Sequence, residues 1–157
     1  MKRLMVVAAL AGGLAAGGLT AATPGWGADG SSSCYTQSAI EAEQAIRYVT
    51  DVMLASTACQ NTTYAEFRLR NRDAIVAYQK AMISHFRGES AFDRWNTALA
   101  NYAAQKQAAV NLGVFCQQAD TLMKQAKALD PAAFRAYAAA QAAAAGAQYA
   151  KCGGAKK

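Results

Sequence analysis

The amino-acid sequence predicts an all-α fold: an antiparallel, up-down four-helix bundle held by two disulfides. Strand signals are nearly absent, since no stretch alternates Val, Ile or Thr with polar residues and no Asn-Gly hairpin turn occurs. Apolar residues instead recur at steps of three and four residues behind four helix-start signals. Four cysteines follow an N-terminus typical of exported proteins.

The N-terminus is typical of a secretory signal. Lys2 and Arg3 precede an uncharged run, residues 4–19. Its length of about 16 residues is short for a transmembrane helix but right for the apolar part of a signal peptide. Small residues favour cleavage after Gly27, with cleavage after Ala22 as the alternative. A retained membrane anchor is the competing interpretation.

These signals divide the chain into four parts. We expect a signal peptide at 1–27, an N-terminal segment at 28–37, a helical bundle at 38–152 and a flexible cationic tail at 153–157. Loss of Lys2 and Arg3 with the signal lowers the formal net charge from +6 to +4, too little to indicate nucleic-acid binding. No transmembrane segment is expected in the mature protein, which we place in the periplasm or among secreted proteins.

Two capping boxes predict the first two helices. Ser38–Glu41 begins the first helix, whose apolar stripe continues to Cys59. Thr63–Glu66 begins the second, and Gly88 is its natural stop. Two polar residues are candidates to interrupt the second helix: Asn71 and Asp73.

The third and fourth helices begin at equally clear signals. The third starts at Ser90 and either runs unbroken to about Leu129 or kinks near Gly113, since glycine in a helix costs about 1 kcal/mol relative to alanine. The fourth starts at Asp130–Pro131, a capping residue followed by proline at the first helical position, and ends at Gly153. Short connections between long helices favour antiparallel neighbours.

The four cysteines fit two disulfides in an oxidising compartment. In an up-down bundle the first helix climbs about 30 Å to Cys59 and the third climbs about 38 Å to Cys116, so the two thiols reach similar heights. Cys34 precedes the first helix and Cys152 ends the descending fourth. We therefore predict Cys59–Cys116 and Cys34–Cys152. An unbroken third helix would leave Cys152 at mid-bundle, and a Cys34–Cys116 bridge would contradict the bundle order.

The sequence contains no catalytic or cofactor motif that we can identify. No C-x-x-C or C-x-x-C-H occurs, which disfavours thiol exchange, zinc and covalent haem. His85 is the only histidine and has no Glu-x-x-His or His-x-x-x-His pattern around it. We interpret it as a helix C-terminal residue favoured by the helix dipole. We expect no cofactor and no enzymatic activity.

The second helix is the most basic stretch of the chain. Its candidate anion-facing residues are Arg68, Arg70, Arg72, Lys80 and Arg87. Alternating positions spread around a helix, so a solvated face with local acidic partners, Glu66 and Asp73, is the competing interpretation. Lipid headgroups, cell-wall polymer or an acidic protein would suit the functional interpretation.

A resemblance supports export but implies no activity. Glu41–Tyr48, then Cys59, then the helical stretch Tyr64–Arg87 resemble a group of exported small helical proteins of Gram-negative bacteria without assigned function. The likeness covers about residues 34–102.

We expect a non-enzymatic periplasmic or secreted helical binding or interaction protein. Its partner would be another periplasmic or cell-envelope protein or an anionic surface, and not nucleic acid. The alternative is a bundle that binds a small ligand or metal through its aromatic core and His85. That core comprises Tyr64, Phe67, Tyr78, Phe92, Trp95 and Tyr102.

Overall fold

The computed structural model describes residues 34–153, so the predicted signal peptide and nearly all of the cationic tail lie outside the described residues. The described chain forms α1 (Gln37–Ala58), α2 (Thr63–Arg70), α3 (Arg72–His85), α4 (Glu89–Ala108), α5 (Leu112–Ala128), α6 (Pro131–Ala145) and a short 3₁₀ helix, η1 (Gly146–Gln148). Between residues 34 and 153 there is no strand, only one isolated bridge between Tyr35 and Lys151. The all-α prediction is confirmed.

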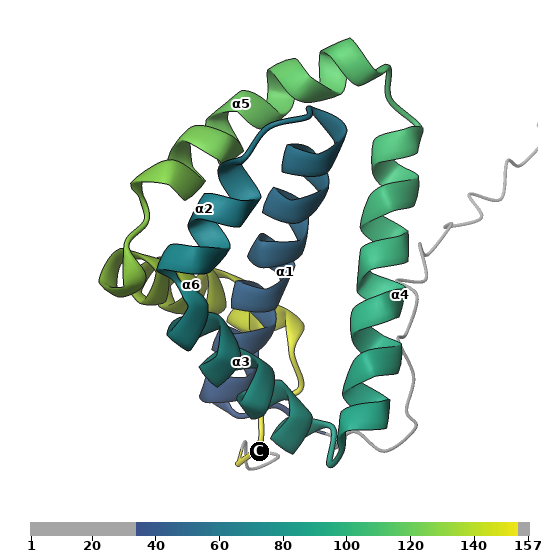
Figure 1. Ribbon diagram of the computed structural model, residues 1–157. Coiled ribbons are helices and arrows are strands. Elements are labelled where there is room, and N and C mark those ends of the chain that lie inside the picture. The colour runs from purple at the N-terminus through teal and green to yellow at the C-terminus, as the bar shows by residue number, and fades with distance from the viewer. Residues whose placement is uncertain (1–33, 154–157) are drawn as a thin grey trace, which may run out of the picture.

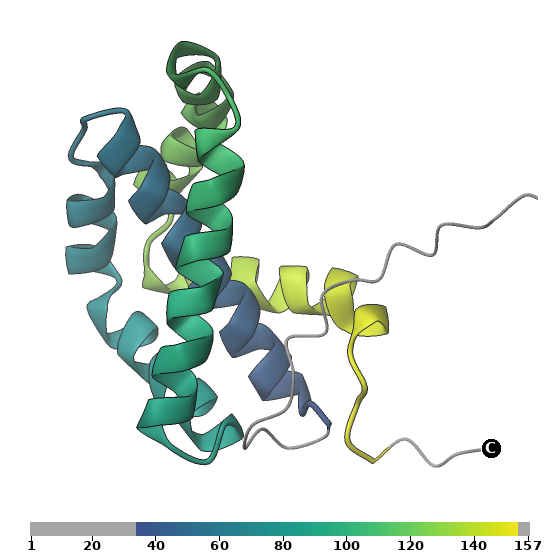
Figure 2. The same cartoon turned by 90° about the vertical axis from the view of Figure 1, so that its right-hand side faces the viewer.

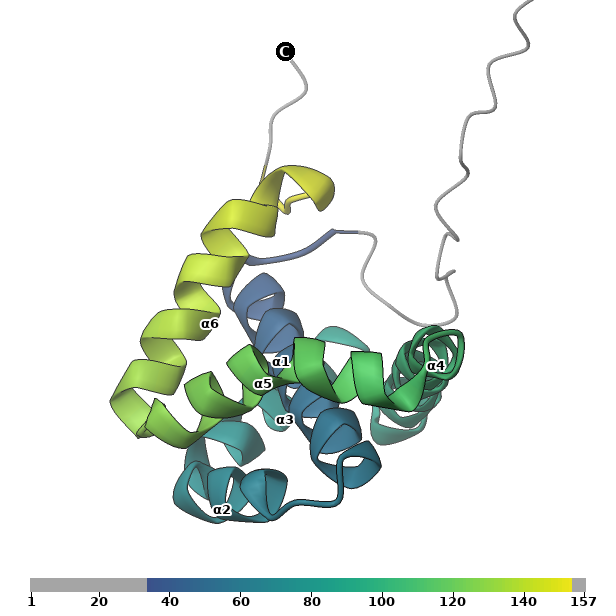
Figure 3. The same cartoon turned by 90° about the horizontal axis from the view of Figure 1, so that it is seen from above.

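The helices surround α1, which contacts all five of the others. The α2–α3 pair runs back along α1, and α4 returns on another side of it (Figure 1). Figure 2 shows that α6 lies across α1 rather than alongside it, and Figure 3 shows α5 crossing over one end of α1. The four-helix, up-down arrangement is therefore not confirmed, because the second and third predicted helices are each divided in two.

Asn71 divides the second predicted helix. Its side chain is fully buried, and its amide nitrogen donates to the carbonyl oxygens of Phe67 and Leu129, at 3.1 Å each. The bond to Leu129 ties the α2–α3 junction to the end of α5, where helix carbonyls lack partners within the helix. Of the two candidate interruptions, Asn71 is the break, whereas Asp73 lies inside α3.

Asn111 divides the third predicted helix. Its side-chain oxygen accepts hydrogen bonds from the backbone N–H groups of Gly113 at 2.9 Å and Val114 at 3.4 Å. These bonds satisfy two donors in the first turn of α5 and start a new helix in a new direction. The predicted kink near Gly113 is confirmed as a full break, although asparagine capping produces it and Gly113 itself is helical.

The N-terminal caps of the first two helices differ from the predicted ones. Thr36, not Ser38, caps α1, with its Oγ1 accepting from the Ala39 N–H at 3.1 Å. At α2 the Ser56 hydroxyl accepts from the Tyr64 N–H, and Asn61 Oδ1 accepts from the Thr63 N–H. Both predicted boxes are wrong in their capping residue because nearby side chains, one of them from α1, satisfy these donors.

The fourth predicted helix has the expected start but an earlier end. Asp130 caps α6 by accepting from the Ala133 N–H at 2.8 Å. The helix stops at Ala145, not near Gly153, because the chain turns back to pair with the segment before α1. There Tyr35 donates its N–H to the Ala150 carbonyl at 2.7 Å, and its own carbonyl accepts from the Cys152 N–H at 2.9 Å.

Both predicted disulfides are present. Cys59–Cys116 joins the end of α1 to the first turn of α5, and Cys34–Cys152 joins the two ends of the described chain. The break before α5 is what leaves Cys116 beside the end of α1. The extended segment after η1 is what brings Cys152 down to Cys34.

Aromatic rings fill the centre of the protein. The ring centroids of Phe67 and Phe134 lie 5.1 Å apart, Tyr48 lies 5.7 Å from Phe67, and Tyr78 lies 5.7 Å from Phe134. All four side chains are buried. Edge-to-face contacts of this kind add to the free energy of burial. Of the other predicted core aromatics Phe92 is buried and Tyr64 and Trp95 are partly buried, whereas Tyr102 is 40% exposed.

Candidate functional site

All five basic residues predicted to face an anion are exposed, and none makes an ion pair among the described residues. Arg70 is held by hydrogen bonds within the protein, which leaves four cations: Arg68, Arg72, Lys80 and Arg87. The first three lie on α2 and α3, and Arg87 follows the end of α3. Two apolar side chains lie between them on the same outer side, Leu69, which is 80% exposed, and Val76, which is 38% exposed. We call these six residues the basic face.

Helical spacing puts most of the basic face on one side. Leu69, Arg72, Val76 and Lys80 follow one another at steps of three and four residues, the spacing that keeps side chains on one side of a helix. Asn71 interrupts the helix within this stripe, but its N–H still bonds the Phe67 carbonyl and its carbonyl still accepts from Ile75. The outer side therefore continues from α2 into α3.

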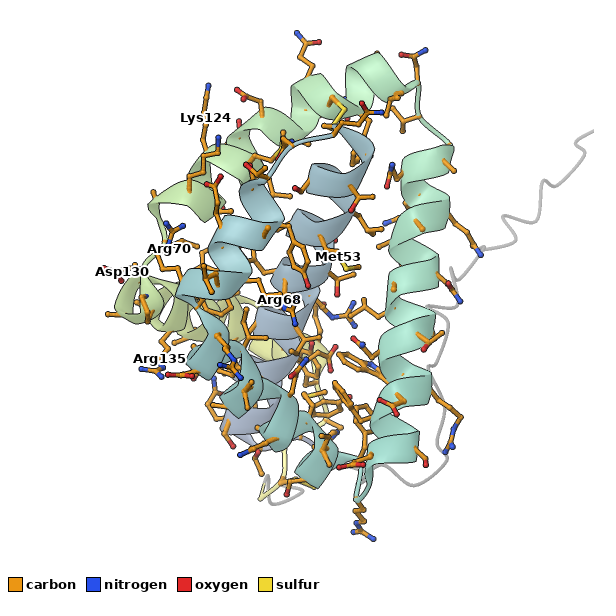
Figure 4. All side chains as sticks on the ribbon, viewed as in Figure 1. Met53, Arg68, Arg70, Lys124, Asp130 and Arg135 are labelled. Atoms are coloured by element: carbon orange, nitrogen blue, oxygen red, sulfur yellow. A yellow bond between two sulfur atoms is a disulfide. The ribbon has the colours of Figure 1, made fainter. Side chains whose placement is uncertain are left out.

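Arg70 is exposed as well, but its donors bond carbonyl groups within the protein, so it is not counted in the basic face. Its Nε donates to the Leu129 carbonyl at 3.2 Å and its Nη2 to the Ala126 carbonyl at 3.1 Å. These are end-of-helix carbonyls of α5, where a cation is favoured. Figure 4 shows Arg68 and Arg70 on opposite sides of α2. The predicted basic residues therefore have two roles: Arg70 bonds the end of α5, and the others remain available to a partner.

Arg87 adopts a strained backbone conformation. Its φ of 58° lies in the left-handed region, which glycine occupies at most helix ends. The turn is closed by a bond from the Gly88 N–H to the Ile83 carbonyl at 3.0 Å. An arginine here costs about 1 kcal/mol relative to glycine. The chain places a cation at the end of the basic face despite this cost.

A groove of about 520 Å³ opens between α1, α4 and α5. Its apolar lining includes Leu54, Leu99, Tyr102, Phe115 and Leu122. Asp51 also lines it, and desolvation by the surrounding protein raises the pKa of its carboxyl group against the opposing effect of Arg47 and Lys106. Lys106 lies with its Nζ 4.9 Å from the centroid of the Tyr102 ring. This groove was not predicted from the sequence, because one of its walls is α5, which exists as a separate helix only after the break at Asn111.

A buried polar cluster joins the C-terminal segment to α1. Glu43 is buried, and its Oε1 accepts from Arg47 Nη2 at 2.6 Å and from the Tyr149 hydroxyl at 3.0 Å, while its Oε2 makes no hydrogen bond among the described residues. Gln44 Nε2 donates to the Tyr149 hydroxyl at 2.8 Å. Burial, together with Glu43, raises the pKa of Tyr149 to about 12. Tyr149 therefore stays protonated and holds the segment against α1.

His85 lies at the C-terminal end of a helix, as predicted, but is buried. It is the last residue of α3, and its ring lies 4.1 Å from the Tyr35 ring, centroid to centroid. Burial lowers the pKa of His85, and nearby Glu43 opposes that shift only in part. The predicted position at the C-terminal end of a helix is confirmed, whereas its burial and its contact with Tyr35 were not predicted. Within the described residues no group of three or more His, Cys, Asp or Glu side chains is placed to hold a metal ion.

Comparison with known proteins gave no match to a family model, to a curated protein or to a solved structure. Among the helices described between residues 34 and 153, none combines the length and apolar character needed to cross a membrane.

Proposed function

We propose that the protein is an exported, non-enzymatic binding protein that acts in the periplasm or as a secreted protein and recognises an anionic partner through its basic face. The observation that supports this most directly is the exposed set of unpaired cations on α2 and α3, with Leu69 80% exposed among them. The two disulfides are typical of proteins in oxidising compartments outside the cytoplasm. The resemblance to exported helical proteins of Gram-negative bacteria remains a prediction consistent with this role.

The distribution of charge supports surface recognition. Glu66, the acid on α2, accepts a hydrogen bond from the Thr62 hydroxyl at 2.6 Å. This bond holds its carboxylate at the N-terminal end of α2. Asp73 is a second acid near the stripe. Glu89 is a third acid, two residues after Arg87. The basic face presents four cations against these three carboxylates, and an excess of one sign on one surface attracts partners of the opposite sign.

A polyanion-binding assay with charge-reversed variants tests the proposal. Wild-type protein is expected to bind a polyglutamate column and to elute as salt rises. The double variant Arg72→Glu/Lys80→Glu should lose retention. The matched control, Arg94→Glu/Lys127→Glu, changes the net charge equally on α4 and α5, where both side chains are exposed. Equal retention of the two variants would show that total charge, and not the basic face, determines binding.

A second candidate function is the binding of a small apolar molecule. The groove between α1, α4 and α5 favours it, since about 520 Å³ lies within the size range of ligand sites. The aromatic core with His85 is a weaker candidate site because its rings already pack against one another. Native mass spectrometry of protein purified from the periplasm is expected to show a bound molecule that Ala103→Trp, a change inside the groove, displaces. Unchanged masses in both proteins would exclude this function.

A further inference from the structure

Resting on the proposed function, we propose that the basic face docks the protein on the surface of an anionic phospholipid bilayer. The face would lie flat against the headgroups, with the axes of α2 and α3 parallel to the membrane plane. This inference names the partner as a lipid surface instead of a soluble polyanion or an acidic protein.

The apolar residues of the basic face distinguish a bilayer from other anionic partners. A soluble polyanion offers nothing for Leu69 to contact, yet this leucine is the most exposed large apolar side chain of the described residues. Val76, two helical turns further on, adds a second exposed apolar side chain. At a membrane interface both would enter the boundary between headgroups and acyl chains, as the apolar side of an interfacial helix does.

The cations of the basic face are placed to reach headgroup phosphates at the same time. Arg72 lies between Leu69 and Val76 in sequence, and Lys80 follows one turn after Val76. Long basic side chains extend beyond short apolar ones, so their charged ends can stay at headgroup level while leucine and valine lie deeper. At 1.5 Å per residue the stretch from Arg68 to Lys80 is about 18 Å long, which allows several headgroups to be contacted together.

The position of α2 lets a flat surface approach. Seen from above, α2 lies at the periphery of the protein, with α1 on its inner side (Figure 3). Its buried residues are Thr63 and Phe67, on the side facing α1, and Arg70 is occupied by α5. The remaining positions of α2 include Arg68 and Leu69, whose side chains are both exposed.

Vesicle co-sedimentation tests the inference. Wild-type protein should sediment with vesicles that contain phosphatidylglycerol and not with vesicles of phosphatidylcholine alone, and binding should weaken as salt rises. Arg72→Glu/Lys80→Glu should weaken the affinity at least about 25-fold, since each cation near an anionic membrane contributes a factor of about five. Leu69→Ser should weaken it by about tenfold while leaving polyglutamate retention unchanged.

Matched variants separate the effect of the face from general effects. Leu112→Ser removes another exposed leucine, 55% exposed on α5, and Arg94→Glu/Lys127→Glu removes the same charge elsewhere. Both should bind vesicles like the wild type. Circular dichroism should show the same helix content for all variants, because every substituted side chain is exposed.

Each remaining outcome contradicts the inference in a distinct way. Retention on polyglutamate without binding to phosphatidylglycerol vesicles would overturn the membrane inference and leave the proposed function in place. If the wild-type protein binds neither polyglutamate nor phosphatidylglycerol vesicles, both the proposed function and the membrane inference are wrong. If the wild-type protein forms a dimer that Leu69→Ser dissociates, the face joins two copies of the chain, and the membrane inference is wrong.

Discussion

Removal of the Cys59–Cys116 disulfide should show how much each of the two bridges contributes to the free energy of unfolding by restricting the unfolded chain. The bridges are nested, because Cys59 and Cys116 both lie between Cys34 and Cys152 in sequence. The inner bridge spans 57 residues and the outer one 118. While the inner bridge is closed, the outer loop is effectively the difference of those separations, about 61 residues.

The chain-entropy relation converts these loops into free energies of unfolding. Together the two bridges should contribute about 8.5 kcal/mol, because each closes a loop of about 60 residues once the other is accounted for. The pair of changes Cys59→Ser and Cys116→Ser should cost about 3.6 kcal/mol while the outer bridge remains. Cys34→Ser with Cys152→Ser should cost about 4.3 kcal/mol, and removal of all four thiols more than the sum of the two.

Urea unfolding followed by circular dichroism measures these differences. The expected order is a larger loss for the outer pair, with a steeper dependence on urea in both variants, since a less constrained unfolded chain exposes more surface. Domains of this size have a total stability of about 5–15 kcal/mol, so loss of both bridges should remove more than half of that stability. A loss below about 1 kcal/mol for the inner pair, or a larger loss for the inner than for the outer pair, would refute the reasoning.

Three further changes should have separable effects on stability, each measured by urea unfolding. Phe134→Ala should cost about 3–5 kcal/mol, since the ring is fully buried among other rings. Arg70→Ala should cost about 1–3 kcal/mol through two lost bonds to the end of α5, whereas Arg68→Ala should change stability by less than about 0.5 kcal/mol. Burial lowers the pKa of His85 below its usual 6.5, so on acidification the unfolded chain binds the proton first. The free energy of unfolding should therefore decrease as the pH is lowered from 6.5. His85→Gln should make this pH dependence weaker, and an unaltered pH dependence would contradict a lowered pKa of His85.

Much of the fold could be predicted because its signals are local. The helix start at Asp130–Pro131 depends on residues adjacent in sequence, and it is confirmed. The disulfide pairing followed from helix lengths and the direction of each helix. It is confirmed even though the third predicted helix is broken, because the break falls five residues before Cys116 and leaves that residue near the end of α1.

The breaks were harder to predict because their causes lie elsewhere in the chain. Asn71 is buried and bonded to the Leu129 carbonyl, a partner 58 residues away in sequence. No local pattern shows that a carbonyl at the end of α5 will lie there. At the α4–α5 junction the signal was local, and a kink near Asn111–Gly113 was predicted. The predicted cause was the glycine, whereas the capping side chain of Asn111 is what starts α5.

The candidate site divides in the same way. Composition identified the basic stretch, but only the structure shows that Arg70 bonds the end of α5, whereas Arg68 and Arg72 are exposed and make no ion pair among the described residues. The exposure of Leu69 was also hidden, although its position between two arginines is a signal that could have been used. The groove had no signal in the sequence, since it depends on how α5 crosses α1 and α4.

The contacts that fasten α2 also explain why its outer side is free to bind. An isolated helix of eight residues is unstable in water, so α2 needs contacts from the rest of the protein. Phe67 supplies them on one side and Arg70 on another, with Asn71 fixing the end of the helix. With these contacts made, the exposed side chain of Leu69 adds little to the free energy of folding, and a serine at this position should change that energy only slightly. If the proposed membrane contact exists, Leu69→Ser should therefore change vesicle binding and leave the free energy of unfolding almost unchanged, since the side chain is 80% exposed.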